Sequence, residues 1–173
     1  LIARMPALRD REYGLNNVSD GVFDSRGAYL FSDGGIYWLN PSRQGTISYL
    51  VQIVNELKSL GFDEVVFEAF AFPDTKFMRF DGDKDTALAE AAKTLVTTCA
   101  TDNFAVSFVQ QPGFALPEGR SRLYLETADA GEAATLAQQT GLADTAVNLV
   151  FLTEVHDTRF DAYSVLRPLD AAH

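Results

Sequence analysis

Three glutamates are the side chains in this sequence best suited to carry a reaction, because each comes at the end of an apolar run that predicts a buried strand. They are Glu68, Glu126 and Glu154. In a parallel α/β fold, ligands bind at the carboxyl ends of the strands, so the three carboxylates are expected to converge on one mouth. Glycoside hydrolysis requires two carboxylates beside the scissile bond, one as acid and the other as base or nucleophile. The three glutamates are therefore the candidate catalytic residues.

Each glutamate also has a purely structural explanation. Glu126 and Glu154 could be solvated strand ends, or anions that complement the start of a helix. Glu68 differs, because the stretch Ala69–Phe72 after it remains apolar. Glutamate is rarely buried without a partner, so Glu68 is expected to face a cleft or a partner cation.

Five further residues are candidates for binding a substrate: Arg4, Tyr37, Trp38, Asn40 and Gln110. Arg4 and Gln110 stand at strand ends, as the glutamates do. Arg4 could contact a substrate, or it could form an ion pair with Glu68 inside the sheet. Trp38 could stack on a sugar ring, whereas the alternative is a tryptophan that covers the end of the core.

No pattern in the sequence indicates a metal or a cofactor. The acidic run Asp81–Asp85 resembles the start of a calcium loop, but Ala92 stands where the bidentate glutamate belongs. The run is therefore expected to cap the following helix. His156 and His173 have no partners at zinc-site spacing. Neither a glycine-rich dinucleotide motif nor a serine nucleophile elbow is present.

Composition limits the class of protein and its partners. The chain has 173 residues, 47% of them hydrophobic, which is enough for one globular domain with a substantial core. Its net charge of −10 argues against binding to nucleic acid or to anionic membranes. No apolar run is long enough to span a bilayer, and the single Cys99 permits no internal disulfide. The sequence does not indicate an oligomeric state.

Strand-like and helix-like patterns alternate along the chain. Six strands are predicted, at or near residues 1–5, 65–67, 105–109, 122–126, 147–152 and 163–169. Helices are predicted over residues 47–57, with start signals in 42–46 and Gly61 as a left-handed cap, over 88–99, and over 130–140 with Asp129 as the N-cap. Residues 114–121 are expected to be irregular.

This alternation favours a parallel sheet with helices outside it. An eight-stranded (β/α) barrel takes about 250 residues. Residues 1–173 are therefore expected to form a single TIM-type (β/α) barrel-like domain that is short of about two βα units. The alternative is an open parallel α/β sheet.

Three motifs resemble one known family. They are Ile2-Ala3-Arg4, the run Tyr37-Trp38-Leu39-Asn40-Pro41, and the run from Gly61 to Glu68 followed by Phe72-Pro73. Together they are similar to the putative glycosyl hydrolase domain family of bacterial barrel proteins, which is related in fold to alpha-amylase-like glycoside hydrolases. The family pattern reads roughly A-R, W-x-N-P and G-F-D-E-I-x-F-D-Y-x-R-F-P. The resemblance implies a (β/α) barrel with Glu68 at the end of its fourth strand, carbohydrate as the partner, and an extracellular or cell-surface location.

The sequence departs from this pattern at the candidate site. The family aspartate is Glu68 here, and the family tyrosine and arginine are Ala69 and Ala71. A family acidic residue after the next strand falls near Phe108 or Val109. Three hypotheses therefore stand: a glycoside hydrolase that uses Glu68 with Glu126 or Glu154, a non-catalytic carbohydrate-binding barrel with a degenerate site, and a structural domain without a ligand.

Overall fold

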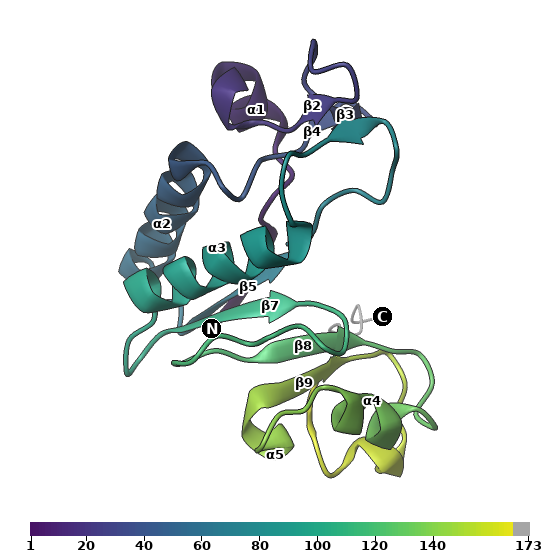
Figure 1. The fold of residues 1–173 in the computed structure, drawn as a ribbon. Coiled ribbons are helices and arrows are strands. Elements are labelled where there is room, and N and C mark those ends of the chain that lie inside the picture. The colour runs from purple at the N-terminus through teal and green to yellow at the C-terminus, as the bar shows by residue number, and fades with distance from the viewer. Residues whose placement is uncertain (168–173) are drawn as a thin grey trace, which may run out of the picture.

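The structure, a computed structural model, describes residues 1–167 and contains one large parallel sheet. Its six strands lie side by side in chain order, from one edge of the sheet to the other (Figure 1). They are β1 (Ile2–Pro6), β5 (Glu64–Glu68), β7 (Ala105–Val109), β8 (Leu123–Glu126), β9 (Leu149–Leu152) and β10 (Ser164–Leu166). Chain order without reversal is the arrangement of a (β/α) barrel, whereas a doubly wound sheet reverses direction at a switch point. Within the described residues β1 and β10 each pair on one side only, so the barrel is incomplete, as predicted.

Alternate residues of each strand face the helices and form the main core. Val65, Phe67, Val106 and Phe108 pack with α2 (Gln44–Ser59) and α3 (Lys84–Cys99). The later strands pack in the same way against α4 (Ala133–Gln139). Figure 1 shows α2 and α3 beside the first strands and α4 beside β8 and β9. Strands that are buried on both faces consist mainly of apolar residues, so the apolar runs in the sequence predicted their positions.

The predicted starts and stops of α2 and α3 are confirmed. Gly61, just after α2, has φ of +84°, the left-handed conformation expected of a cap. At α3, Asp83 Oδ1 accepts a hydrogen bond of 2.7 Å from the backbone N–H of Thr86. The acidic run therefore caps the helix, as its sequence indicates.

Two predicted boundaries in the second half are wrong. The N-cap of α4 is Glu132, because Asp129 Oδ1 instead accepts from the N–H of Gly131, 2.7 Å away, in a turn before the helix. Strand β9 starts at Leu149, because Asp144 caps a short helix, α5 (Thr145–Asn148), over the residues predicted to begin the strand. The predicted irregular connection between β7 and β8 is confirmed. The last predicted strand corresponds to β10, although its end at 168–169 lies outside the described residues, as does His173.

A layer of short elements, not predicted from the sequence, lies between β1 and α2 and extends to β6. It contains α1 (Arg11–Asn16), the 3₁₀ turn η1 (Val18–Asp20), β2 (Phe23–Asp24), β3 (Ser32–Asp33), β4 (Ile36–Tyr37) and β6 (Met78–Arg79). Antiparallel pairs β2–β6 and β3–β4 form two small ribbons. We refer to this layer as the excursion.

Two tyrosines attach the excursion to α2. Tyr13 of α1 stacks on Tyr49 of α2 with ring centroids 4.0 Å apart. The hydroxyl of Tyr13 donates to Asp20 Oδ2 at 2.7 Å, and that of Tyr49 donates to Asp10 Oδ2 at 2.8 Å. Each phenol therefore works as an apolar ring and as a hydrogen-bond donor.

Three tyrosines should ionise only when the protein unfolds. Burial, helped by Asp20, raises the pKa of Tyr13 to about 12. Burial also raises the pKa of Tyr49 and of Tyr124, helped by Asp10 and Glu64 respectively. Because the folded state favours the neutral phenol, this stabilisation is complete below the ordinary tyrosine pKa of about 10 and is lost as the pH rises beyond it. In the native protein, tyrosinate absorbance should therefore stay below the value for six ionised tyrosines until the protein unfolds. A single early transition in the native protein would contradict this, and the urea-unfolded chain is the reference.

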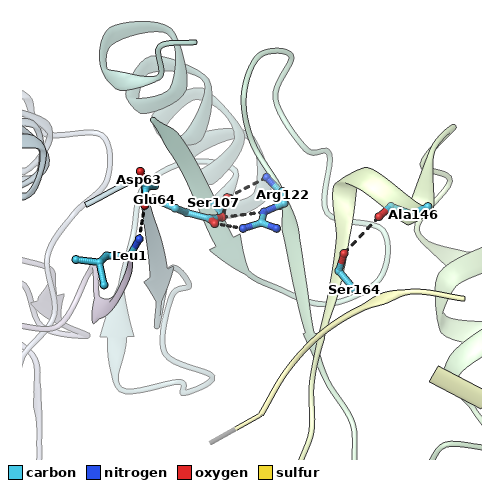
Figure 2. Close-up of polar contacts among 7 residues, drawn as sticks. All are labelled: Leu1, Asp63, Glu64, Ser107, Arg122, Ala146 and Ser164. Carbon is cyan, nitrogen blue, oxygen red and sulfur yellow. Dashed lines mark hydrogen bonds and ion pairs between the residues drawn. The ribbon is translucent and has the colours of Figure 1, made fainter. Parts of the chain in front are cut away.

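The side of the sheet that faces away from the helices carries a buried charged cluster near the N-terminal ends of the strands, which we call the lower end of the sheet. Figure 2 shows the contacts of this cluster. Glu64, 2% exposed, accepts a 2.5 Å hydrogen bond from Ser107 Oγ and a 3.1 Å bond from Arg122 Nε. A second guanidinium nitrogen of Arg122 also bonds Glu64, and the backbone N–H of Arg122 donates to Ser107 Oγ at 3.0 Å. The cluster joins β5, β7 and the start of β8, so charge and backbone pairing hold the same three strands together.

Removing the carboxylate from this cluster should destabilise the protein strongly. In the Glu64→Ala variant Arg122 would stay partly buried without its partner, and we expect the free energy of unfolding in urea to fall by about 3 kcal/mol. The matched control is Asp81→Ala, which also takes a carboxylate from an arginine, but on the surface. Its urea midpoint should remain close to that of the unaltered protein. An equal fall in the free energy of unfolding in the two variants would show that the buried cluster stabilises the protein no more than a surface ion pair does.

Candidate active site

An ion pair joins the first two strands near their C-terminal ends, which we call the upper end of the sheet. Arg4 of β1 donates from Nε to Glu68 Oε1 at 2.6 Å, and its Nη2 lies 2.5 Å from the same oxygen. In the register of the two strands Pro6 lies opposite Glu68, so Arg4 reaches forward along the sheet to the carboxylate. Both side chains are more than a third exposed. The expected partner cation of Glu68 is therefore Arg4, and the pair faces the open end of the barrel.

The backbone directly after Glu68 is strained. Ala69 has φ of +48°, the one non-glycine residue within 1–167 in the left-handed region. The carbonyl of Glu68 before it accepts a 2.8 Å hydrogen bond from the N–H of Ala7. Phe70 after it is 1% exposed, packs on Phe108, and has its carbonyl bonded by the Gln110 side-chain amide. Contacts on both sides thus hold Ala69 in a conformation that alanine disfavours.

The two other glutamates line one cavity of about 500 Å³ together with Arg4. We call it the carboxylate cleft; its lining residues are Arg4, Glu126, Thr127, Ala128, Leu152, Thr153, Glu154, Val155 and Leu166. Glu126 and Glu154 are exposed, and in the described part of the chain neither forms an ion pair. Glu68 joins the group through its bond to Arg4. The carboxyl ends of β1, β5, β8 and β9 therefore bring all three predicted carboxylates to one end of the sheet.

Two threonines of the cleft were not singled out in the sequence. Thr127 and Thr153 directly follow β8 and β9. The N–H of Thr127 donates to the Leu152 carbonyl at 3.2 Å, and the N–H of Thr153 donates to the Leu166 carbonyl at 3.3 Å. Their position at the strand ends is the same signal that identified the glutamates. Their hydroxyls hold the loops that follow, because Thr127 Oγ1 accepts from the N–H of Asp129 and Thr153 Oγ1 accepts from the N–H of Val155, each at 3.1 Å.

Three of the predicted binding residues, Tyr37, Trp38 and Asn40, lie in or next to the excursion. Trp38 is 9% exposed, packs with Val22 and Met78, and has the Arg9 guanidinium 5.1 Å from its ring centroid. Its position matches the alternative in which the tryptophan covers a core. Tyr37 belongs to β4 and is partly buried.

Asn40 and Gln110 lie outside the carboxylate cleft as well. Asn40 Oδ1 accepts a 2.9 Å hydrogen bond from the N–H of Ser42, and the residue borders a separate cavity of about 500 Å³ with Arg43 and Arg79. Gln110 borders a third cavity, of about 710 Å³. The structure therefore brings Arg4 and the glutamates together and leaves the other four predicted residues apart from them.

The residues around the cleft offer acid–base and hydrogen-bonding chemistry. Within residues 1–167 no group of three or more histidine, cysteine, aspartate or glutamate side chains is arranged to hold a metal ion. In the same residues no helix is long and apolar enough to cross a membrane. Carboxylates at the strand ends of a (β/α) barrel lie where this fold binds ligands, and paired carboxylates are what glycoside hydrolysis requires.

Residues 1–107 match the family described as "Putative glycosyl hydrolase domain". Because this match covers more than half of the 173 residues, the chain belongs to that family. The resemblance found in the short motifs is thus confirmed over a longer stretch. No curated protein matches the sequence.

Three solved structures share the fold. A hypothetical protein from Ruminiclostridium thermocellum ATCC 27405 is 23% identical with a TM-score of 0.55, over 62% of this chain and 56% of its own. Ega3 of Aspergillus fumigatus, in complex with galactosamine, is 12% identical with a TM-score of 0.65, over 96% of this chain and 73% of its own. The glycoside hydrolase domain of PelA from Pseudomonas aeruginosa is 12% identical with a TM-score of 0.63, over 98% and 78%. At these identities the likeness supports the barrel fold alone.

Relieving the backbone strain at Ala69 should increase the free energy of unfolding. Glycine adopts positive φ without a steric cost, so Ala69→Gly is expected to raise the free energy of unfolding by roughly 0.5–1 kcal/mol, after allowing for the greater freedom of glycine in the unfolded chain. The control is Ala71→Gly, at a position without positive φ, which should lower it by roughly 0.5 kcal/mol. Urea unfolding measures both. A loss of stability in Ala69→Gly would show that the left-handed backbone carries no strain.

Proposed function

We propose that this domain binds a carbohydrate in the carboxylate cleft and hydrolyses a glycosidic bond there. The observation that carries the proposal is the convergence of Arg4, Glu126 and Glu154 on one cavity, with Glu68 bonded to Arg4. These residues lie at the end of the barrel where the fold binds ligands, and the family description names glycosyl hydrolysis.

The contacts of the carboxylates suggest different roles for them. Arg4 donates to one oxygen of Glu68 and so fixes its direction, which suits a nucleophile or a base. Glu126 and Glu154 carry no ion pair among the described residues, so no partner cation holds either side chain away from a leaving oxygen. We assign Glu68 as the nucleophile or base and one of the other two as the acid.

The charge of the cleft points to the kind of sugar. Glu126 and Glu154 line the cleft with Arg4, Glu68 is bonded to Arg4, and the Arg167 guanidinium donates to the carbonyl of Val155 at the cleft. Carboxylates therefore still outnumber arginines there, and the whole chain carries a net charge of −10. Such a field repels uronates and attracts amino sugars, and it leaves neutral sugars unaffected. The galactosamine bound to Ega3 is an amino sugar. We therefore propose a neutral or amino-sugar glycan, met outside the cell or at its surface as the family resemblance implies.

A second candidate is a domain that binds carbohydrate without cleaving it. It is favoured by Ala69 and Ala71, which stand where the family pattern has tyrosine and arginine. A purely structural domain without a ligand has less support, because the cavity beside Arg4 is open.

Glutamine substitutions test the proposal, since they remove the ionisable group with little change of shape. Reducing-sugar release would be measured on galactosamine polymers, neutral glucans and polygalacturonate. We expect turnover of a neutral or amino-sugar polymer, and a fall of about 100-fold or more in Glu68→Gln and in one of Glu126→Gln and Glu154→Gln. Glu90→Gln, on the exposed side of α3, is the control and should keep full activity.

Two other results separate the candidates. Binding of a polymer without turnover would replace hydrolysis by the binding-only function. Neither binding nor turnover on any of these polymers, or full activity in Glu68→Gln, would overturn the proposal.

A further inference from the structure

The largest of the cavities described above, about 710 Å³, is not part of the carboxylate cleft. We call it the second cavity. Three segments far apart in the sequence line it. They are residues 71–74 after β5, the first turns of α3, and residues 110–115 after β7.

The lining of the second cavity has the chemistry of a sugar site. Phe72 and Phe114 offer aromatic surface, to which the C–H faces of a sugar ring bind. Gln111 and Asp85 are exposed and offer hydrogen-bonding groups for hydroxyls, and Lys84 lies 5.8 Å from the centroid of the Phe72 ring. A mainly apolar hollow with a few placed polar groups is the usual form of a small-ligand site.

The shape of the second cavity depends on residues without bulky side chains. Ala71, on the loop after β5, and Ala89, on α3, both border it. Gly113, with φ of +95°, turns the chain after β7 at its edge. A longer side chain at either alanine would therefore occupy space that is now open.

The second cavity and the carboxylate cleft lie at the same end of the sheet. The N–H of Gln110, in the second cavity, donates to the Tyr124 carbonyl of β8 at 3.1 Å. Glu126, in the cleft, comes two residues after Tyr124, or about 7 Å along the strand. In the loop after β5, which pairs with β7, Ala71 comes three residues after Glu68. Neighbouring strand ends thus connect the two hollows.

We propose that the second cavity binds further sugar units of a chain whose other units lie in the carboxylate cleft, so that the substrate is an oligosaccharide or polysaccharide rather than a mono- or disaccharide. The inference rests on the proposed function, because it takes the cleft as the site of the reacting unit. Phe72 and Phe114 hold the ring faces of the added units, and Gln111 and Asp85 bind their hydroxyls.

The test measures affinity against chain length. Galactosamine and neutral glucan oligosaccharides of one, two, four and six units are titrated into the protein by calorimetry, with NMR to locate the amides that respond. Affinity should rise roughly ten-fold between two and six units. The monosaccharide should move signals of Thr127 and Thr153 in the cleft, and the longer chains should also move Gln111 and Gly113.

Two variants connect this gain to the second cavity. Ala89→Trp fills it from α3, and Gln111→Ala removes a polar contact from an exposed loop position. Both should bind the monosaccharide as the unaltered protein does and should lose most of the gain with length. Thr94→Trp, exposed on the same helix and outside the cavity, is the matched control and should keep the gain.

The outcomes separate the two proposals. Binding in the cleft with no gain in affinity with length, or an equal gain in Ala89→Trp and Gln111→Ala, would overturn the extended site and leave the proposed function standing. If no oligosaccharide moves the cleft signals, the proposed function fails and the extended site fails with it.

Discussion

The parallel pairing of β1 with β5 is the contact on which the site depends. It joins Ile2–Pro6 to Glu64–Glu68 across α2 and the part of the excursion that precedes it in the chain. This pairing places Arg4 within reach of Glu68, and the N–H of Ala7 extends the ladder to the carbonyl of Glu68. A register shift of one residue would turn Arg4 and Glu68 to opposite faces. The Tyr13–Tyr49 stack holds the excursion on α2 and so supports the long connection between the two strands.

Charge is treated differently at the two ends of the sheet. At the lower end, Glu64 is buried and its oxygens are bonded by Ser107 and Arg122, so the charge is compensated locally. At the upper end, Glu126 and Glu154 are exposed, and neither of the two arginines at the cleft, Arg4 and Arg167, forms an ion pair with them. This division agrees with the general rule that the lower end of such barrels provides stability and the upper end provides function. An excess of carboxylate is costly inside a fold and tolerable at an open mouth, where water and a ligand can reach it.

Sequence patterning located the strands and the long helices because each depends on local signals. The apolar runs became strands, Gly61 and Asp83 marked helix ends, and strand-end position found the carboxylates. The excursion was missed because its strands are two residues long and depend on tertiary pairing. The start of α4 was misplaced because Asp129 had two local uses, a cap or a turn, and Gly131 favoured the turn. The burial of Trp38 could not be derived either, since it depends on Val22 and Met78, which are distant in the sequence.

Ala69 shows why a departure from a family pattern is not by itself a loss of function. A backbone φ of +48° is more favourable for glycine than for other residues, yet the chain has alanine at this position. Glycine would relax the turn and also let Glu68 and Phe70 move independently. Alanine keeps the turn stiff, provided that Ala7 and Gln110 hold the carbonyls on either side. The Gln110 side chain thus holds the Phe70 carbonyl in place. The small side chain of Ala71 leaves the second cavity open. The same short segment therefore contains the carboxylate that is bonded to Arg4 and a small residue that borders the second cavity.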